Sequence, residues 1–401
     1  MSRRRLLGAT ALLALGTACA PALPPPTSPP PTSPPPAPPR PIDGADALVD
    51  WIAAHPEAAS VLVDDGRGRL ITHLADRSRP LASAGKVVHL TAYAQAVVAG
   101  RLNPDTRVPV AEWERWYVPG TDGFAHRQAL QALGVGADDA VRWDDLAAVM
   151  IAVSDSAAPD LLRETLGDNA LVAAAAAGGW TAPDLPSFGG EGLLAPGVFT
   201  TDPPPDPANR RAATVASLRR FAGDPGWRAA VAQQAAAFEA AAQGAATQDP
   251  ATQDPATQDP ATQDPATQHP AVDRLIEWSD GGPAGTVTQL AGMHRAAATD
   301  GFGPETSAIV RAHLERPLAD RLPPGVLGAG QKGGSLPGIL TNAVTLRRAD
   351  GTLGVAVVAL SGMPMPAYLE ALTSGAPVLL TQQALLDDDL LGRLGAAVGV
   401  R

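Results

Sequence analysis

The sequence contains one cysteine and only two lysines, and both scarcities limit its chemistry. Because Cys19 stands alone, no internal disulfide can form and thiol redox chemistry is not expected. Among the 30 basic residues, Lys86 and Lys332 are the only lysines. Arginine stays protonated at accessible pH, whereas a desolvated lysine can become a neutral base. The two lysines are therefore candidate catalytic residues, the alternative being biased codon usage that spared two surface lysines.

The sequence also lacks the patterns of several other kinds of site. It has no cluster of histidine, cysteine and aspartate with metal-ligand spacing, and no glycine-rich phosphate loop follows a predicted strand. A formal net charge of −11 disfavours nucleic acid as a partner. We therefore expect no metal, no cofactor and no nucleic-acid partner.

The N-terminus has the pattern of an export signal. Three arginines at positions 3–5 precede an apolar run at 6–18 that is too short to span a bilayer, which predicts a signal peptide over residues 1–18. Residues 2–7 also resemble a twin-arginine signal. Cys19 resembles the lipid-acceptor cysteine of bacterial lipoproteins, although Gly16 stands where leucine is usual. We expect a lipid anchor at Cys19 on the outer side of the cell membrane, the alternative being free secretion.

Two low-complexity segments divide the remainder. Residues 19–42 are rich in proline and predict an extended linker. In residues 246–270 the pentad Ala-Thr-Gln-Asp-Pro occurs five times, with His269 in the last copy. Proline at every fifth position excludes a helix or a central strand, so this insert is expected to be a disordered surface loop. Residues 43–401 are otherwise expected to form one domain.

The periodicity of apolar residues predicts strands at both ends of this domain and helices between them. Strands are expected at 60–63 and 70–74, with a hairpin at 339–348 and 353–361. The predicted helices span 43–55, 83–100, 144–156, 158–166, 169–177, 229–242 and 381–398. This order indicates an α+β fold whose sheet pairs the two ends of the chain.

Ser83 and Lys86 form the first of three candidate motifs. Ser83 is expected at the start of its helix, where free backbone amides favour negative charge. Lys86 follows three residues later and shares the same helix face. A neutral Lys86 could take the proton of Ser83 and generate an alkoxide for attack on a carbonyl. Serine-x-x-lysine alone is weak evidence, since it arises by chance in many chains.

Two further motifs raise the specificity. Ser154-Asp155-Ser156 follows at a helix end, and Lys332-Gly333-Gly334-Ser335 opens a predicted strand. In this order the motifs resemble those of the serine β-lactamases and penicillin-binding proteins, and in particular the class A branch with Ser-x-x-Lys, Ser-Asp-Asn and Lys-Thr-Gly. The resemblance covers about residues 43–401 apart from roughly 200–275. It implies an antiparallel sheet of N- and C-terminal strands, helices on both faces and an all-helical subregion.

The resemblance also implies roles for individual residues. Ser83 would be the nucleophile, Lys86 its base, and Ser154 the donor of a proton to the leaving nitrogen. The backbone amides of Ser83 and Ser335 would form the oxyanion hole.

Other residues would bind the substrate. Lys332 would hold its carboxylate, with Gly334, Ser335 and Ser156 beside it. Tyr117 would flank the mouth of the cleft, although its neighbour Trp116 could take that place.

Three departures from the class A pattern affect the expected activity. Ser156 replaces asparagine and Gly333 replaces threonine. The family carries a glutamate followed four residues later by asparagine to activate the deacylating water. Here Glu191 stands at a plausible distance along the chain, but Ala195 follows it at the fourth position. Hydrolysis of an acyl-enzyme would then be slow.

The resemblance implies a serine hydrolase that acts through an acyl-enzyme on a small-molecule or peptidoglycan-derived substrate at the cell envelope. β-Lactamase activity and D-Ala-D-Ala peptidase or esterase activity both stay open at this point. The alternative from another class is a non-catalytic envelope-binding module on a degenerate scaffold.

Overall fold

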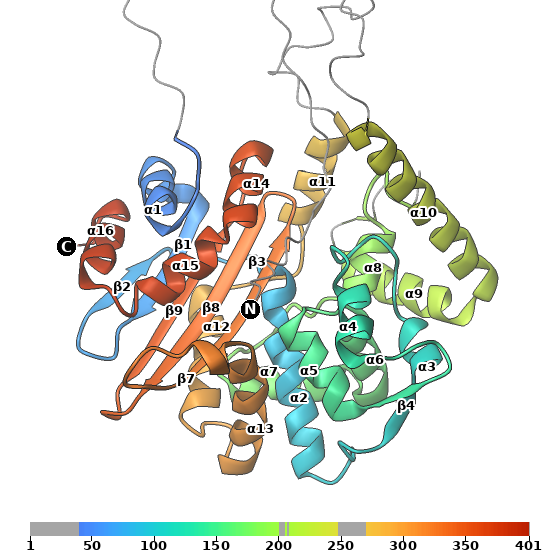
Figure 1. The fold of residues 1–401 in the computed structure, drawn as a ribbon, viewed down its shortest axis with the longest axis horizontal. Coiled ribbons are helices and arrows are strands. Elements are labelled where there is room, and N and C mark those ends of the chain that lie inside the picture. The colour runs from blue at the N-terminus through green and yellow to red at the C-terminus, as the bar shows by residue number, and fades with distance from the viewer. Residues whose placement is uncertain (1–39, 200–204, 207, 248–269, 401) are drawn as a thin grey trace, which may run out of the picture.

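A five-stranded antiparallel sheet is the framework of the molecule, seen in a computed structural model (Figure 1). The structure describes residues 40–199, 205–206, 208–247 and 270–400. The strand order is β2-β1-β9-β8-β7. The strands are β1 (Ala59–Asp64), β2 (Leu70–His73), β7 (Val326–Leu336), β8 (Ile339–Arg348) and β9 (Leu353–Leu360). Because β1 pairs with β9, the two ends of the domain meet at the centre of the sheet, which confirms the predicted α+β fold.

Both faces of the sheet are buried by helices. Strand β9 has no charged residue, and its side chains alternate between two hydrophobic cores. Val357 belongs to the core shared with the helical lobe, whereas Val358 belongs to the core on the opposite face. The second face is covered by α1 (Ala45–Ala54), α14 (Met365–Ser374), α15 (Ala376–Gln383) and α16 (Asp388–Ala397). Helix α12 (Val287–Ala298) packs on the first face and begins with a Thr286–Gln289 capping box.

The helical lobe surrounds one buried helix. Helix α2 (Lys86–Val98) packs against α5, α6, α7 and α13, and most of its side chains are inaccessible to solvent. The other helices of the lobe are α3 (Val110–Glu114), α4 (Ala125–Leu133), α5 (Trp143–Ala152), α6 (Ala157–Leu166), α7 (Asp168–Ala177) and α13 (Pro304–Glu315). Two small ladders border it, β3 (Arg79–Pro80) with β6 (Ala284–Gly285) and β4 (Arg107–Pro109) with β5 (Ala140–Arg142). The all-helical subregion expected from the sequence is therefore present.

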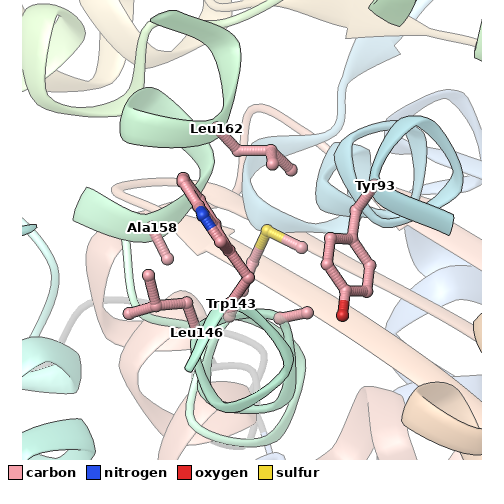
Figure 2. Close-up of a pocket in the computed structure, with 7 residues that line it drawn as sticks. Tyr93, Trp143, Leu146, Ala158 and Leu162 are labelled. Carbon is pink, nitrogen blue, oxygen red and sulfur yellow. The ribbon is translucent and has the colours of Figure 1, made fainter. Parts of the chain in front are cut away.

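The interior of this lobe is closely packed. A cavity between α2, α5 and α6, whose lining residues are drawn in Figure 2, has a volume of about 10 Å³, roughly the space of one water molecule. Its lining is apolar apart from Tyr93, whose hydroxyl donates to Asp144 at 3.0 Å. The cavity is too small for an organic ligand, so a substrate site must lie elsewhere.

The described residues of the segment 184–284, which we call the insertion, include four helices between the helical lobe and β6. These are α8 (Phe188–Leu193), α9 (Arg210–Gly223), α10 (Pro225–Thr247) and α11 (Pro270–Asp280). The base of the insertion is closed by a hydrogen bond of 3.0 Å from Ala284 N to Asp184 Oδ2. The predicted helix at 229–242 is the middle of α10. The predicted signal peptide, Cys19, most of the proline-rich linker and nearly all of the pentad insert, with His269, lie outside the described residues.

The sequence prediction was wrong at the C-terminus. Instead of one helix over 381–398, the structure has α15 and α16 separated at residues 384–387. The Asp387 side chain accepts hydrogen bonds from the backbone amides of Asp389 and Leu390, so it caps a new helix. None of the helices in the described part of the chain has the length and hydropathy of a membrane span.

Candidate active site

Ser83 lies in a short 3₁₀ turn, η2 (Ala82–Gly85), that leads directly into α2. The prediction that Ser83 begins the α-helix was therefore wrong, since α2 begins at Lys86. Ala82 has a φ of 47°, a left-handed conformation that is incompatible with α-helix. The turn keeps Ser83 partly exposed while Lys86 is fully buried.

The ammonium group of Lys86 contacts the Ser154–Ser156 motif. Its Nζ donates to Ser154 O at 2.6 Å, to Ser154 Oγ at 3.2 Å and to Ser156 Oγ at 3.1 Å. Burial lowers the pKa of Lys86 to about 8, although the nearby carboxylates of Asp155 and Asp122 favour the charged form. Ser156, which stands in place of the family's asparagine, thus contacts the proposed base directly.

Lys332 reaches the same hydroxyl from the sheet. It lies within β7 rather than at its start, so the prediction that it opens the strand was wrong. Its Nζ donates to Ser154 Oγ at 3.0 Å and to Gly333 O at 2.7 Å. Burial and the charge of Lys86 lower its pKa well below the usual value. The Ser154 hydroxyl therefore lies between both lysines of the sequence.

Strand β7 packs closely against the turn that carries Ser83. A Cβ atom at Gly334 would lie 2.5 Å from Ser83 N and 2.6 Å from Ala84 N. No residue with a side chain fits there without moving the strand or the turn, so glycine is required at this position. The next residue, Ser335, is exposed. Two chain segments about 250 residues apart thus form one side of the site.

The glycine that replaces threonine in the third motif has a structural reason. A Cβ atom at Gly333 would approach Asn342 Oδ1 to 2.9 Å. Asn342 is held in place because its Nδ2 donates to Thr381 Oγ1 at 2.6 Å. The Asn342 side chain therefore takes space that a larger residue at 333 would need.

Ser154 adopts a backbone conformation that its neighbours must stabilise. Its φ is 69°, in the left-handed region that disfavours residues other than glycine. The adjacent Asp155 is fully buried and accepts from Trp113 Nε1 at 3.0 Å and from Ala158 N at 2.6 Å. His126 Nδ1 lies 2.7 Å from the second oxygen of this carboxylate. Asp155 thereby fixes the turn that presents Ser154 to both lysines.

Tyr117 stacks on this network at the edge of the site. Its ring lies 4.1 Å from that of His126, at an interplanar angle of 21°. Tyr117 is partly exposed, whereas Trp116 is buried, so Tyr117 is the aromatic residue available to a ligand at this edge.

Glu191 is engaged by two arginines rather than by the lysines. Its Oε2 accepts from Arg210 Nη2 at 2.5 Å, and its Oε1 accepts from Arg211 Nη1 at 2.9 Å. Burial raises the pKa of Glu191, and the two guanidinium groups oppose that shift. Both carboxylate oxygens thus serve a nearly buried ion-pair network, so Glu191 is not positioned as the base that activates water.

The side chain that lies against Lys86 from this segment is Phe188. Lys86 Nζ lies 4.7 Å from the centroid of the Phe188 ring, and the ring also packs edge-on against His89. The backbone amides of Phe188 and Gly189 donate to the buried Asp160 at 3.1 and 2.8 Å. Burial raises the pKa of Asp160 to about 7. Sequence reasoning missed Phe188 because no local pattern connects it with a lysine 102 positions earlier.

Among the residues that the structure describes, no group of three or more histidine, cysteine, aspartate or glutamate side chains could hold a metal ion. The groups that meet around the Ser154 hydroxyl are the amines of Lys86 and Lys332, and Lys86 also contacts the hydroxyl of Ser156. Such groups suit proton transfer.

A model of the beta-lactamase enzyme family matches residues 45–244 of this chain. Among solved structures, the chain is similar to a β-lactamase from Sphaerobacter thermophilus DSM 20745, with 17% identity, a TM-score of 0.48 and coverage of 88% of this chain and 98% of that one. A β-lactamase from Chitinophaga pinensis DSM 2588 has 13% identity, a TM-score of 0.47 and coverage of 85% and 99%. A variant of PBP-A, solved as an acyl-enzyme complex with penicillin G, has 13% identity, a TM-score of 0.46 and coverage of 86% and 99%.

No curated protein sequence matches the chain. The match to the family model and the three motifs that meet at Ser154 agree with one another. The chain belongs to the beta-lactamase enzyme family, whose model matches residues 45–244.

Proposed function

We propose that the protein is a serine hydrolase that is acylated at Ser83 by β-lactam or related amide and ester substrates and that releases the acyl group slowly. The observation that carries this proposal is the Ser154 hydroxyl, which lies within hydrogen-bond distance of Lys86 and Lys332. In the proposed reaction Lys86 is the base for Ser83, and the Ser154 hydroxyl provides the proton for the leaving group.

The proposed reaction begins with proton transfer from Ser83 Oγ to neutral Lys86. With a pKa of about 8, roughly a tenth of Lys86 is neutral at pH 7. The Ser83 oxygen then bonds to the substrate carbonyl carbon, and the amides of Ser83 and Ser335 stabilise the oxyanion. As the carbon–nitrogen or carbon–oxygen bond breaks, the Ser154 hydroxyl gives its proton to the leaving group. Ser154 regains a proton from the adjacent lysine ammonium, and the acyl-enzyme remains.

Slow release follows from the surroundings of Lys86. The Glu191 carboxylate is engaged by arginines, and a phenyl ring that cannot accept a proton lies against the amine. Helix α8 therefore places no carboxylate beside Lys86 that could act as a base on the acyl-enzyme. This favours a penicillin-binding protein with D-Ala-D-Ala peptidase or esterase activity over a fast β-lactamase.

Intact-mass measurement on the full chain with a penicillin and with a fluorophosphonate tests the proposal. We expect one adduct on the wild type, none on Ser83→Ala, and little turnover of a chromogenic cephalosporin. Rapid cephalosporin turnover with no accumulated adduct would assign the protein to the lactamases instead. If no lactam, fluorophosphonate or activated ester labels Ser83, the scaffold is a non-catalytic binding module, as Ser156 and Gly333 in the altered motifs would allow.

We also propose that the protein is exported and attached to the outer side of the cell membrane through a lipid on Cys19. The basic and apolar N-terminus and the proline-rich linker that follows support this location. Incorporation of labelled palmitate into the wild type but not into Cys19→Ala would agree with it. Wild type recovered without lipid in the culture medium would contradict it and favour secretion.

A further inference from the structure

We infer that a cleft at the end of the sheet, away from Lys332, binds a small organic carboxylate. The cleft has a volume of about 250 Å³, slightly below the usual range of small-molecule pockets, which is about 300–1,000 Å³. It therefore suits a ligand of a few non-hydrogen atoms. The inference does not depend on the proposed acylation of Ser83, because none of the three motifs contributes to this cleft.

Four segments that are distant in sequence line the cleft. Arg67 comes from the turn between β1 and β2, Val326 from the start of β7, Arg348 from the end of β8, and Leu386 from the break between α15 and α16. Val326 precedes Lys332 by six residues in the same strand, which at about 3.3 Å per residue amounts to roughly 20 Å. The cleft is therefore separate from the candidate active site.

The first feature that indicates an anion is the buried charge of Arg348, whose side chain is only 5% exposed. Its Nη1 donates to Asp65 O at 2.9 Å and to Thr352 Oγ1 at 3.4 Å, and its Nη2 donates to Leu385 O at 2.6 Å. None of these acceptors is a carboxylate, so no ion pair within the described residues neutralises this guanidinium. A guanidinium has five N–H groups, and these three hydrogen bonds leave two of them for a ligand.

The second feature is another arginine whose charge is also unpaired. Arg67 is exposed, and its side chain has no hydrogen bond or ion pair with any residue that the structure describes. Burial and the charge of Arg67 lower the pKa of Arg348, so the two guanidinium groups are close enough to repel each other. An anion bound by both arginines would remove this repulsion and would receive charge-assisted hydrogen bonds.

The remaining lining selects the kind of anion. Asp350 also lines the cleft, and its Oδ1 accepts from Thr352 N at 2.9 Å and from Thr352 Oγ1 at 2.7 Å. Two arginines and one aspartate leave one net positive charge, which favours a monoanion over a doubly charged phosphate. Val326 and the half-exposed Leu386 offer apolar surface beside these charges. A carboxylate that carries a short alkyl group matches both parts of the lining.

Titration calorimetry of the full chain with butyrate, and with uncharged butyramide for comparison, tests the inference. We expect saturable binding of one butyrate with a dissociation constant on the order of 1 mM, and binding of butyramide that is weaker by about tenfold or more. Arg67→Ala should weaken butyrate binding about fivefold. Because the Arg67 side chain has no partner in the described part of the chain, its loss should not impair folding. Arg101→Ala, at an exposed arginine outside the cleft, is the matched control and should bind as the wild type.

Asp350→Asn should have the opposite effect and strengthen butyrate binding about fivefold. An asparagine Oδ1 can still accept both hydrogen bonds from Thr352, so the turn is retained while the opposing charge is removed. Arginines that only support the fold would not make the protein respond to butyrate in this way.

Four results would overturn the inference. The first is equal affinity for butyrate and butyramide, and the second is unchanged butyrate affinity in both Arg67→Ala and Asp350→Asn. The third is tighter binding of inorganic phosphate than of butyrate, which would exclude a carboxylate site. The fourth is butyrate binding that is lost in Lys332→Met but kept in Arg67→Ala, which would place the carboxylate in the candidate active site.

Discussion

Lys86 and Lys332 donate hydrogen bonds to one oxygen, Ser154 Oγ, at 3.2 and 3.0 Å. Neither amine has a carboxylate among its hydrogen-bond partners in the described part of the chain, and both are buried. Burial disfavours the charged form of each amine, and the charge of Lys86 lowers the pKa of Lys332 further. The chain thus holds two amines of lowered basicity around a single hydroxyl, an arrangement that favours proton transfer over static charge.

The rate of Ser83 acylation should rise with pH and level off above pH 8. Only neutral Lys86 can accept the proton, and its pKa is lowered to about 8 by burial. Fluorophosphonate labelling rates between pH 6 and 10, corrected for hydrolysis of the reagent, would show this midpoint. A rate that is flat across this range would mean that the proton goes elsewhere.

The lowered pKa of Lys86 should also make the free energy of unfolding depend on pH. The folded-state pKa of about 8 lies below the ordinary value of 10.5. Between these values the unfolded chain binds more protons, so the free energy of unfolding should rise with pH across that window. Urea denaturation at pH 8 and pH 10 would measure this change. Lys86→Met, which has no titratable group, should lose this component of the pH dependence.

Lys86→Arg should abolish labelling of Ser83 while retaining the positive charge. Arginine does not deprotonate at accessible pH, so the loss should reach about 100-fold or more. Labelling kinetics together with a thermal melt would separate a chemical defect from misfolding. A folded Lys86→Arg protein that still labels at the wild-type rate would remove Lys86 from its proposed role.

Ser154→Ala and Ser154→Gly should lose acylation equally but differ in stability. Both remove the hydroxyl that the two lysines share. Because the φ of Ser154 is 69°, glycine relieves backbone strain that alanine retains, and the glycine variant should be more stable by about 1 kcal/mol. Denaturant midpoints and labelling rates measure the two effects. A Gly variant less stable than the Ala variant would contradict the left-handed conformation.

Gly334→Ala should impair both stability and acylation. The added Cβ would lie 2.5 Å from Ser83 N, forcing β7 away from the turn that carries the nucleophile. We expect a loss of about 1–3 kcal/mol in the free energy of unfolding and a reduced labelling rate. Gly85→Ala is the matched control, because no atom lies within 4 Å of its Cβ and its φ is −63°. Equal stability of both variants would show that β7 does not pack as described.

Phe188→Glu should shorten the lifetime of the acyl-enzyme. A carboxylate in place of the ring would lie near Lys86 and could activate water. Glu191→Gln should leave that lifetime unchanged but lower the free energy of unfolding by about 3 kcal/mol, because Arg210 would lose its charged partner. Decay of a penicillin adduct, followed by mass, measures both lifetimes. Unchanged adduct decay in Phe188→Glu would contradict the expected effect of a carboxylate at position 188. Slower adduct decay in Glu191→Gln would show that Glu191 activates water after all.

Local sequence patterns were sufficient for strands β1, β2, β8 and β9 and for helices α5, α6 and α7 of the lobe, but not for the start of β7. The hairpin predicted at 339–348 and 353–361 matches β8 and β9, because alternating apolar residues flank a clear turn. Helices α6 and α7 likewise match the helices predicted at 158–166 and 169–177. The break between α15 and α16 depends on a single capping aspartate, a weaker signal than the apolar pattern that continues through it.

The site was less accessible to sequence reasoning. The Ser83–Lys86 spacing is local, but the contact of Phe188 with Lys86 and the hydrogen bond of Asp155 with His126 depend on tertiary packing. Glu191 was chosen as the candidate base because of its distance along the chain from the second motif. That distance does not reveal that Arg210 and Arg211 pair with its carboxylate. The proximity of Ile276 in α11 to Gly338 likewise depends on tertiary packing.

Strand β9 has a consequence for biogenesis. It occupies the sheet interior between β1 and β8, yet it consists of residues 353–360, whereas its neighbour β1 consists of residues 59–64. A nascent chain that lacks β9 would expose an unpaired edge on β1 and another on β8. Such edges can pair with strands of other molecules and lead to aggregation. Strand β1 must therefore wait for residues 353–360, and termination of synthesis before these residues should yield aggregates rather than a smaller active protein.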